Sequence, residues 1–278
     1  MGFRTVFMAI GAAQDDGEIE RAVTICEGLG AHLSLLVLGI APPPPASPYG
    51  VVSNDIWAGD IRQGQDEAAA RAKAIEARLA GTALSTLVAA QYIDRGTVAT
   101  LAARFARYAD LTLVTPKAAG YDSMQNWVMD GALFESGRPI LMLPAGPVSF
   151  PAAKRVMLCW DASVQASKAV RDAIGLMKAA DEVHAVLIDP VPSFDGHGPE
   201  PGADLGAYLG RHGIAAVIHR LPREGKDTGE VLRRRAVDLN ADLMVMGGFG
   251  HSRLRERIFG GTTTSMMKNP IVPVLMAH

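Results

Sequence analysis

Two stretches of the sequence repeat each other at an almost constant spacing, and this repeat constrains the fold more than any single motif. The tetrapeptide YADL around Asp110 recurs as NADL around Asp242, 132 residues further on (242 − 110). Pro139 and Pro270, which stand in matching apolar regions, are 131 residues apart (270 − 139). A chain of 278 residues can hold two ordinary domains. The spacing therefore predicts two copies of one structural unit.

The pattern within each copy alternates short apolar runs with amphipathic segments. Such apolar runs suit parallel strands that are buried on both faces, and the amphipathic segments suit helices. Thr97 stands where it could cap one of these helices. In the first half, the pattern predicts strands at 5–10, 32–40, 111–114 and 139–143 and helices at 18–29, 65–79 and 97–108. In the second half, it predicts strands at 155–159, 183–188, 215–219, 243–246 and 271–276 and helices at 163–179 and 230–239.

Strands that alternate with helices form right-handed βαβ units around a parallel sheet. The predicted fold class is therefore α/β, with two tandem doubly wound domains. A proline- and glycine-rich segment follows the second strand of each half, at 41–50 and 189–202, and we interpret both segments as solvated crossovers. The sequence PAGPVSFPAA at 144–153 has the composition of a linker. We therefore predict domains at 1–146 and 154–278.

The composition excludes several classes of protein. The formal net charge of −2 gives no electrostatic basis for binding nucleic acid or an anionic membrane. No apolar run approaches the roughly 20 residues that span a bilayer, and the N-terminal segment lacks the basic flank and cleavage site of a signal peptide. The two cysteines, Cys26 and Cys159, lie far apart in sequence, which suits a reducing compartment. We expect a cytoplasmic protein with no nucleic-acid or membrane partner.

The most informative segment is MGGFGHSRLRERIFGGTTTSMM at 246–267, which follows a predicted buried strand. In doubly wound sheets, ligands bind outside the carboxyl ends of the strands. Glycines there let backbone N–H groups approach a ligand. A helix that begins near Thr262 or Thr263 would direct the positive end of its dipole at a phosphate. The spacing matches neither the dinucleotide nor the Walker glycine pattern. From the residues alone, an anion site and a purely structural turn are equally supported.

The spacing Gly247-x2-Gly250-x9-Gly260 resembles the nucleotide-binding pattern of the universal stress protein family. The sequences GHSRLRE and GGTT are similar to a common variant in that family, and the resemblance covers both halves. It implies a five-stranded parallel sheet with helices on both faces in each domain. It also implies an intramolecular pseudo-dimer of the two domains, in which the strands near Leu141 and Val274 meet at their edges. A homodimer is a further arrangement that it allows.

The resemblance implies an ATP site in the second half only, with Mg²⁺ accompanying the phosphates. The family's first-strand aspartate corresponds to Asp161, followed by Ala162, and its second-strand backbone contact falls near Leu187. The loop residues that the resemblance assigns to the nucleotide are Gly247, Gly250, Gly260, Gly261, Thr262 and Thr263. Gly261 departs from the family pattern, which has a hydroxyl side chain there, and Thr262 or Thr263 is the candidate substitute.

The first half departs further from this pattern. Gly11 stands where the second half has Asp161, and Thr115-Pro116-Lys117-Ala118 stands where it has Gly247 to Gly250. A loop with side chains and a proline cannot offer the same cradle of N–H groups. We predict that the first domain has a degenerate loop without a family-type nucleotide site. The segment 121–134 would then be a repurposed surface or a packed lid.

Several side chains also have a structural explanation. Asp161 follows a strand, where an aspartate often forms a turn or caps the next helix. The run Arg233 to Arg235 points in several directions around a helix, so we interpret it as solvated. Four histidines of the second half lack the spacing of a zinc site, although a site assembled in space stays open. These are His184, His197, His212 and His219.

Three functions are compatible with these features. The first is a cytoplasmic stress-response protein that binds or senses an adenine nucleotide, ATP in the first instance, through its C-terminal domain. The second is a scaffold that acts without nucleotide, through protein partners or another small ligand. The third is a slow ATPase. The sequence shows no nucleophile elbow and no acid–base pair in the glycine loop, so we assign no catalytic residue and no metal ligand. Asp161 and the glycine spacing favour the first function.

Overall fold

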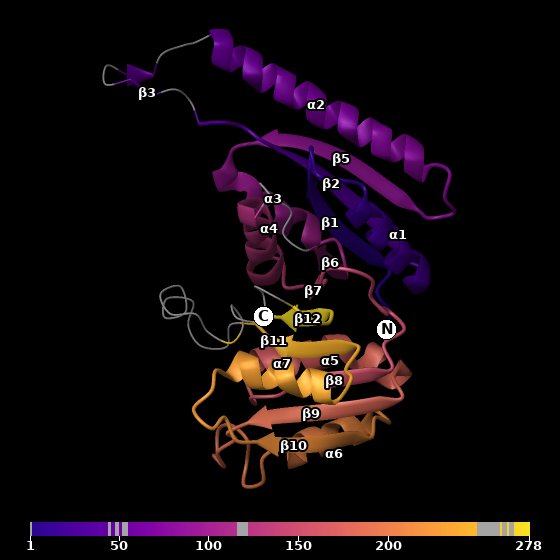
Figure 1. The fold of residues 1–278 in the computed structure, drawn as a ribbon, viewed down its shortest axis with the longest axis vertical. Coiled ribbons are helices and arrows are strands. Elements are labelled where there is room, and N and C mark those ends of the chain that lie inside the picture. Colours follow the sequence, from indigo (N-terminus) through magenta and orange to yellow (C-terminus); the bar gives the residue numbers. More distant parts are fainter. Residues whose placement is uncertain are drawn as a thin grey trace. The chain divides into compact units, whose positions relative to one another are not determined.

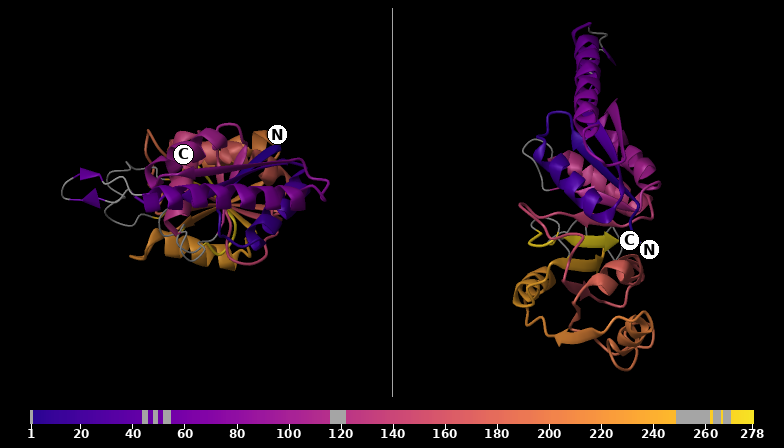
Figure 2. Two further views of the ribbon diagram at one scale, coloured as in Figure 1. Left: turned by 90° about the horizontal axis from the view of Figure 1, so that it is seen from above. Right: turned by 90° about the vertical axis from the view of Figure 1, so that its right-hand side faces the viewer.

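The computed structural model divides into two compact units, which we call the first unit (residues 3–136) and the second unit (residues 137–278). Each unit contains parallel strands with helices packed on them (Figures 1 and 2). The structure describes residues 2–43, 46–47, 50–51, 55–115, 122–248, 262, 266 and 270–278.

The first unit is built on four parallel strands in the order β6-β1-β2-β5 (Figure 1). The chain moves outward from β1 through β2 to β5 and then returns to β6, so right-handed crossovers place α1 and α2 on one face and α3 on the other. Helix α4 packs against α3. The strands are β1 (Thr5–Gly11), β2 (His32–Ile40), β5 (Thr86–Ile93) and β6 (Leu111–Val114), and the helices are α1 (Gly17–Leu29), α2 (Asp55–Leu79), α3 (Val98–Ala106) and α4 (Asp122–Glu135). A short antiparallel pair, β3 (Ala46–Ser47) and β4 (Gly50–Val51), precedes α2.

The second unit has five parallel strands in the order β10-β9-β8-β11-β12, and β7 pairs antiparallel with β12. Helices α5 and α6 lie on one face and α7 lies on the other (Figure 2). The strands are β7 (Ile140–Met142), β8 (Arg155–Cys159), β9 (Glu182–Ile188), β10 (Ala216–Leu221), β11 (Leu243–Gly247) and β12 (Val274–Ala277), and the helices are α5 (Val164–Ala179), α6 (Ala203–Arg211) and α7 (Thr228–Asp238). The predicted fold class, tandem doubly wound α/β, is confirmed. The predicted five parallel strands are present in the second unit, whereas the first unit has four because β7 groups with the second unit.

The two units repeat the same strand register. Val6 of β1 pairs with Leu111 of β6, and the corresponding Val156 of β8 pairs with Leu243 of β11. The apolar residues of these central strands are buried, as expected for strands covered on both faces. Extended to the strand ends, the register makes two pairs of equivalent positions, Gly11 with Asp161 and Thr115 with Gly247.

A repeated aspartate holds the first strand of each unit against the fourth. The carboxylate of Asp110 accepts hydrogen bonds from the N–H groups of Arg4 (2.8 Å) and Thr5 (3.0 Å). The carboxylate of Asp242 accepts two from the backbone where β8 begins, at 2.8 and 2.9 Å. These are the aspartates of the YADL and NADL repeats, so the repeat marks a structural clamp.

Segment 121–134, predicted to be a repurposed surface or a packed lid, lies in α4 over its described part, and much of that part is buried. The structure corrects several other local predictions. Thr97 does not cap α3 with its side chain; its hydroxyl donates to the backbone oxygen of Asp94 (3.0 Å) instead. Helix α2 begins at Asp55 rather than at 65. Strand β5 and, in the second unit, helix α6 form where no element was predicted.

The predicted pairing of the strands near Leu141 and Val274 is confirmed. Leu141 of β7 lies opposite Leu275 of β12, and Met142 lies opposite Val274. The antiparallel pairing removes the exposed edge of β12. It also explains why contacts group β7 with the second unit, whereas the predicted boundary at 146 places it with the first domain.

Within the described ranges, no helix is both long enough and apolar enough to cross a membrane.

The aspartate clamps should contribute measurably to stability. We expect Asp110→Ala and Asp242→Ala each to lower the free energy of unfolding by about 1–3 kcal/mol, because each leaves backbone N–H groups without a charged acceptor. Asp66→Ala, on the exposed side of α2, is the matched control and should change stability by less than about 0.5 kcal/mol. Urea unfolding followed by circular dichroism measures all three. A clamp variant as stable as the control would contradict this role.

Candidate functional site

The carboxyl ends of β8 and β11 meet at the point where the strand order of the second unit reverses. From β8 the chain builds outward through β9 and β10, and then returns to place β11 and β12 on the other side of β8. The crossovers leave such a point on opposite faces, and doubly wound proteins bind ligands outside the strand ends there. Because Cys159 of β8 pairs with Met246 of β11, Trp160 and Gly247 lie level with each other at these strand ends.

Asp161 forms a turn that starts helix α5. Its Oδ1 accepts hydrogen bonds from the N–H of Ser163 (3.0 Å) and from the hydroxyl of Ser163 (2.6 Å). The Ser163 oxygen in turn accepts from the N–H of Ala166 (3.1 Å) and caps the helix. Ala162 between them adopts a φ of 59°, which is uncommon for a residue with a side chain.

The structural role of Asp161 is therefore present, and it uses only one carboxylate oxygen. The side chain is exposed, and within the described residues Oδ2 has no hydrogen-bond partner. A free carboxylate oxygen at the carboxyl ends of β8 and β11 can accept hydrogen bonds from the hydroxyl groups of a ligand. Both interpretations of Asp161 are thus compatible in one geometry.

Gly247 has a packing requirement of its own. A Cβ at this position would lie 2.5 Å from the backbone nitrogen of Ala166 and 2.9 Å from the carbonyl carbon of Gln165. The first turn of α5 therefore approaches the end of β11 too closely for any side chain. The next residue, Gly248, is held by backbone: its N–H donates to Ala277 (2.9 Å). Packing therefore explains the glycine at position 247, whatever this loop binds.

Leu187 lies one strand further along, near the end of β9. Its side chain is fully buried and would contact a Cβ at Gly202, the N-cap of α6. Only its backbone could therefore face a ligand. Beyond it, Asp189 accepts a hydrogen bond from the N–H of Arg223 (2.9 Å) and pairs with its guanidinium (3.6 Å), which joins the ends of β9 and β10.

The rest of the predicted site is described only in part. Thr262 has helical backbone and is half-buried, as expected for a helix that begins there. Met266, one turn later, is buried and contacts the Arg233 guanidinium through its sulfur (3.8 Å). The predicted contacts at Gly250, Gly260, Gly261 and Thr263 lie outside the described residues. In the described ranges no group of three metal-binding side chains occurs.

The equivalent point of the first unit is filled by its own side chains. The side-chain oxygen of Gln14 accepts a hydrogen bond from the N–H of Gly11 (3.1 Å). Gly11 is the position equivalent to Asp161. Gln14 is buried, and its Nε2 has no partner in the described part of the chain. Thr115, equivalent to Gly247, is also buried, with Gln125 of α4 beside it at 3.5 Å. The loop after β1 therefore packs inward.

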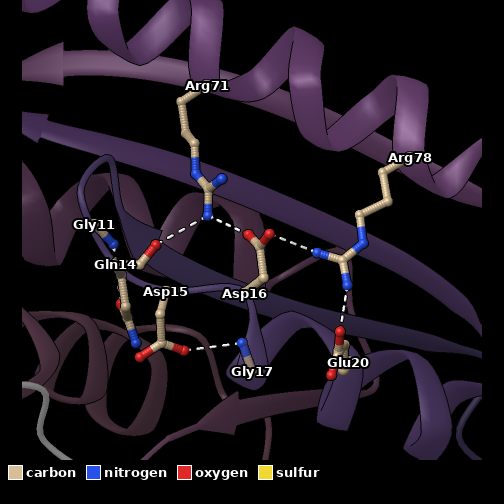
Figure 3. A network of polar contacts seen from close by, with 8 residues as sticks. All are labelled: Gly11, Gln14, Asp15, Asp16, Gly17, Glu20, Arg71 and Arg78. Carbon is tan, nitrogen blue, oxygen red and sulfur yellow. Dashed lines mark hydrogen bonds and ion pairs between the residues drawn. The ribbon is translucent and has the colours of Figure 1, made fainter.

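Arginines of α2 hold this loop in place (Figure 3). The Arg71 guanidinium donates to the backbone oxygen of Gln14 (2.9 Å) and to the carboxylate of Asp16. Arg78 pairs with the other Asp16 oxygen (2.6 Å) and with Glu20 of α1. The loop that carries Asp161 in the second unit has no counterpart of these arginine contacts among the described residues.

Sequence reasoning missed a polar chain that joins β9, β10 and α7. An Arg235 Nη2 lies 3.0 Å from His219 Nδ1, His219 Nε2 lies 3.1 Å from His184 Nδ1, and His184 Nε2 lies 3.0 Å from Glu182. A guanidinium only donates, so each histidine must accept at Nδ1 and donate from Nε2, and both rings are neutral. Four groups thus form one directed chain.

This chain corrects the interpretation of the basic run. Arg234 is exposed as predicted, but Arg233 and Arg235 are half-buried and engaged, so the prediction that all three are solvated is wrong. The pairing of His184 with His219 places two histidines side by side. They are explained by hydrogen bonding to Glu182 and Arg235 rather than by a metal.

The histidine pair predicts a loss of stability in mild acid. Burial, followed by repulsion from the charge of Arg235 and from His184 when that ring is protonated, lowers the pKa of His219 from its ordinary 6.5. Near pH 6.5 the His219 side chain therefore binds a proton in the unfolded chain but not in the folded one. The unfolding free energy falls as the pH drops from 6.5 toward the pKa of His219 in the folded chain. Denaturant midpoints between pH 8 and pH 5 measure this. His219→Gln should flatten this part of the profile, whereas His212→Gln, whose ring packs on Tyr208, should retain it.

A second prediction concerns Gly247. Gly247→Ala should lower the unfolding free energy by about 1–3 kcal/mol, since the new Cβ meets backbone that cannot rotate away. Gly210→Ala is the matched control in the same unit, because a Cβ at Gly210 meets nothing within 4 Å. It should be neutral or stabilising by up to about 1 kcal/mol, because alanine favours a helix. Equal stability of the two variants in urea would show that the α5 contact is not tight.

Comparisons with known proteins agree with the fold of the chain. Residues 152–278 match the sequence model of the universal stress protein family. A universal stress protein of Synechocystis sp. is 27% identical over 133 residues, which are 46% of this chain and 44% of that relative. The match therefore spans less than half of that relative's length.

Solved structures match over almost the whole chain. A universal stress protein from Archaeoglobus fulgidus has a TM-score of 0.66 at 18% identity and covers 98% of this chain and 95% of its own. A putative universal stress protein from Pseudomonas aeruginosa has a TM-score of 0.55 at 15% identity and covers 99% and 93%. At these identities the likeness establishes the fold, a tandem arrangement of α/β domains.

Proposed function

Because this chain belongs to the universal stress protein family, we propose that its second half is an adenine-nucleotide binding module, with ATP as the first candidate ligand. The observation that carries the proposal is the free, exposed Oδ2 of Asp161 beside Gly247, at the strand reversal of the second unit. Nucleotide binding is common at such reversals in doubly wound sheets.

The described residues fit the sugar end of a nucleotide. Asp161 would accept hydrogen bonds from ribose hydroxyls, Ala162 would carry the backbone of that turn, and the backbone near Leu187 would meet the base. The triphosphate would rest on the loop from Gly247 to Thr263, with the helical N–H groups near Thr262 as donors. When bound, Mg²⁺ would neutralise part of the phosphate charge.

The proposal is a binding role rather than turnover. Among the described residues at these strand ends, Asp161 is the only carboxylate that we assign to the ligand. One of its oxygens already accepts two hydrogen bonds from Ser163. Efficient hydrolysis needs a group positioned to activate water, which this arrangement does not supply. Binding would instead bias the contacts of a cytoplasmic stress-response protein. Domains at 1–146 and 154–278, edge-paired as a pseudo-dimer, are part of the proposal, and the β7–β12 pairing supports it.

Two variants separate the ligand role of Asp161 from its structural role. Asp161→Ala removes the carboxylate and weakens the α5 cap, whereas Ser163→Ala weakens the cap and keeps the carboxylate. We expect Asp161→Ala to weaken ATP binding about ten-fold or more, since a hydrogen bond to a charged group contributes about 1.5–3 kcal/mol. Ser163→Ala should keep the affinity within about three-fold while it lowers the melting temperature.

Isothermal titration calorimetry with Mg²⁺-ATP and thermal unfolding measure these two quantities. Equal losses of affinity in both variants would assign Asp161 to the cap alone. No heat of ATP binding to the unmodified, ligand-free protein would defeat the proposal and favour a nucleotide-independent scaffold.

A further inference from the structure

The first unit contains a cavity of about 950 Å³ at the carboxyl end of its sheet. It is lined by the residues just after β1, by the end of β2, by Tyr92 of β5 and by residues of α2 and α4. The cavity lies beside the point where Gln14 closes the strand reversal, but Gln14 does not line it. It is large enough for a small-molecule ligand.

Two aromatic side chains line this cavity, Tyr92 of β5 and Trp127 of α4. The Tyr92 ring lies against Gly39 of β2 and Gly64 of α2, and a Cβ at either glycine would overlap the ring. The ring is therefore held in a slot that two glycines create, and it is half-buried. Neither the Tyr92 hydroxyl nor the Trp127 N–H makes a hydrogen bond within the described residues. The Tyr92 ring thus presents a fixed aromatic surface, and both rings have a polar group that is free within the described residues.

The charge of the cavity is negative. Asp60 and Glu67 stand two turns apart on the same side of α2, with Gln63 between them, and all three line the cavity. The Gln63 amide donates to Glu67 (2.8 Å), and no described arginine or lysine pairs with Asp60 or Glu67. Among the described residues, the lining contains no basic side chain. Such a site repels a polyphosphate and attracts a cation.

We propose that the first half binds a small organic cation with an ammonium group at this cavity. An ammonium ion is attracted to the faces of tryptophan and tyrosine rings, and the two carboxylates add to that attraction. The volume exceeds what a bare metal ion needs, and in the described ranges no three metal ligands cluster. The proposal does not depend on nucleotide binding by the second half.

Choline is a suitable probe, because its neutral analogue 3,3-dimethyl-1-butanol has the same shape without the charge. Calorimetric titration of the full chain should show choline binding that weakens as sodium chloride is added, and much weaker binding of the analogue. Asp60→Asn should weaken choline binding roughly three- to ten-fold. Trp127→Leu should weaken it at least as much.

Asp66→Asn is the matched control, since Asp66 is exposed on the same helix and does not line the cavity. It should leave the affinity unchanged. Asp60 is also exposed, so Asp60→Asn should keep the fold even if Trp127→Leu does not. Equal binding of choline and its neutral analogue, or equal effects of Asp60→Asn and Asp66→Asn, would overturn the proposal. Displacement of choline by adenosine monophosphate, with tighter monophosphate binding in Asp60→Asn, would identify a nucleotide pocket instead.

Discussion

The pairing of the first strand with the fourth is the interaction on which both candidate sites depend. Asp110 and Asp242 fix this pairing by accepting two backbone N–H groups each at the start of β1 and β8. Because the chain reverses direction across the sheet at that pair, the helices leave on opposite faces and the strand ends stay uncovered. The clamps act at the amino end of the strands, and the chemistry lies at the carboxyl end.

Differences in loop length then decide what each reversal point holds. In the second unit, α5 begins three residues after Asp161, so its first turn presses on β11 and only Gly247 fits. In the first unit, α1 begins six residues after the equivalent Gly11. The longer loop turns Gln14 inward and leaves room for Thr115. One register thus gives an open turn in one unit and a closed one in the other.

Features set by local pattern could be predicted from the sequence. The repeated aspartates, the buried strands at 32–40 and 111–114 and the βαβ order followed from periodicity and spacing. Strand β5 did not, because its residues are mostly half-buried and its apolar run, Leu87 to Ala90, is short and half alanine, which has a low strand propensity. The chain from Arg235 to Glu182 joins residues up to 53 positions apart (235 − 182), and no short-range signal reports such a contact. The Tyr92 slot needs two glycines from different elements, which only the fold brings together.

The two proposals assign ligands of opposite charge to the same edge of one fold. This is physically reasonable because the sheet supplies only position, whereas the charge comes from loops and from the helix that faces the strand ends. In the first unit that helix is α2. Asp60 and Glu67 lie in its N-terminal half, and both line the cavity. In the second unit the corresponding helix, α6, is short. The segment just before it is joined to β10 because Arg220 donates to the backbone oxygen of Pro201 (2.8 Å). Among the described contacts, α6 brings no carboxylate toward Asp161. The longer α2 therefore accounts for the acidic side chains at the cavity of the first unit, which α6 does not supply in the second.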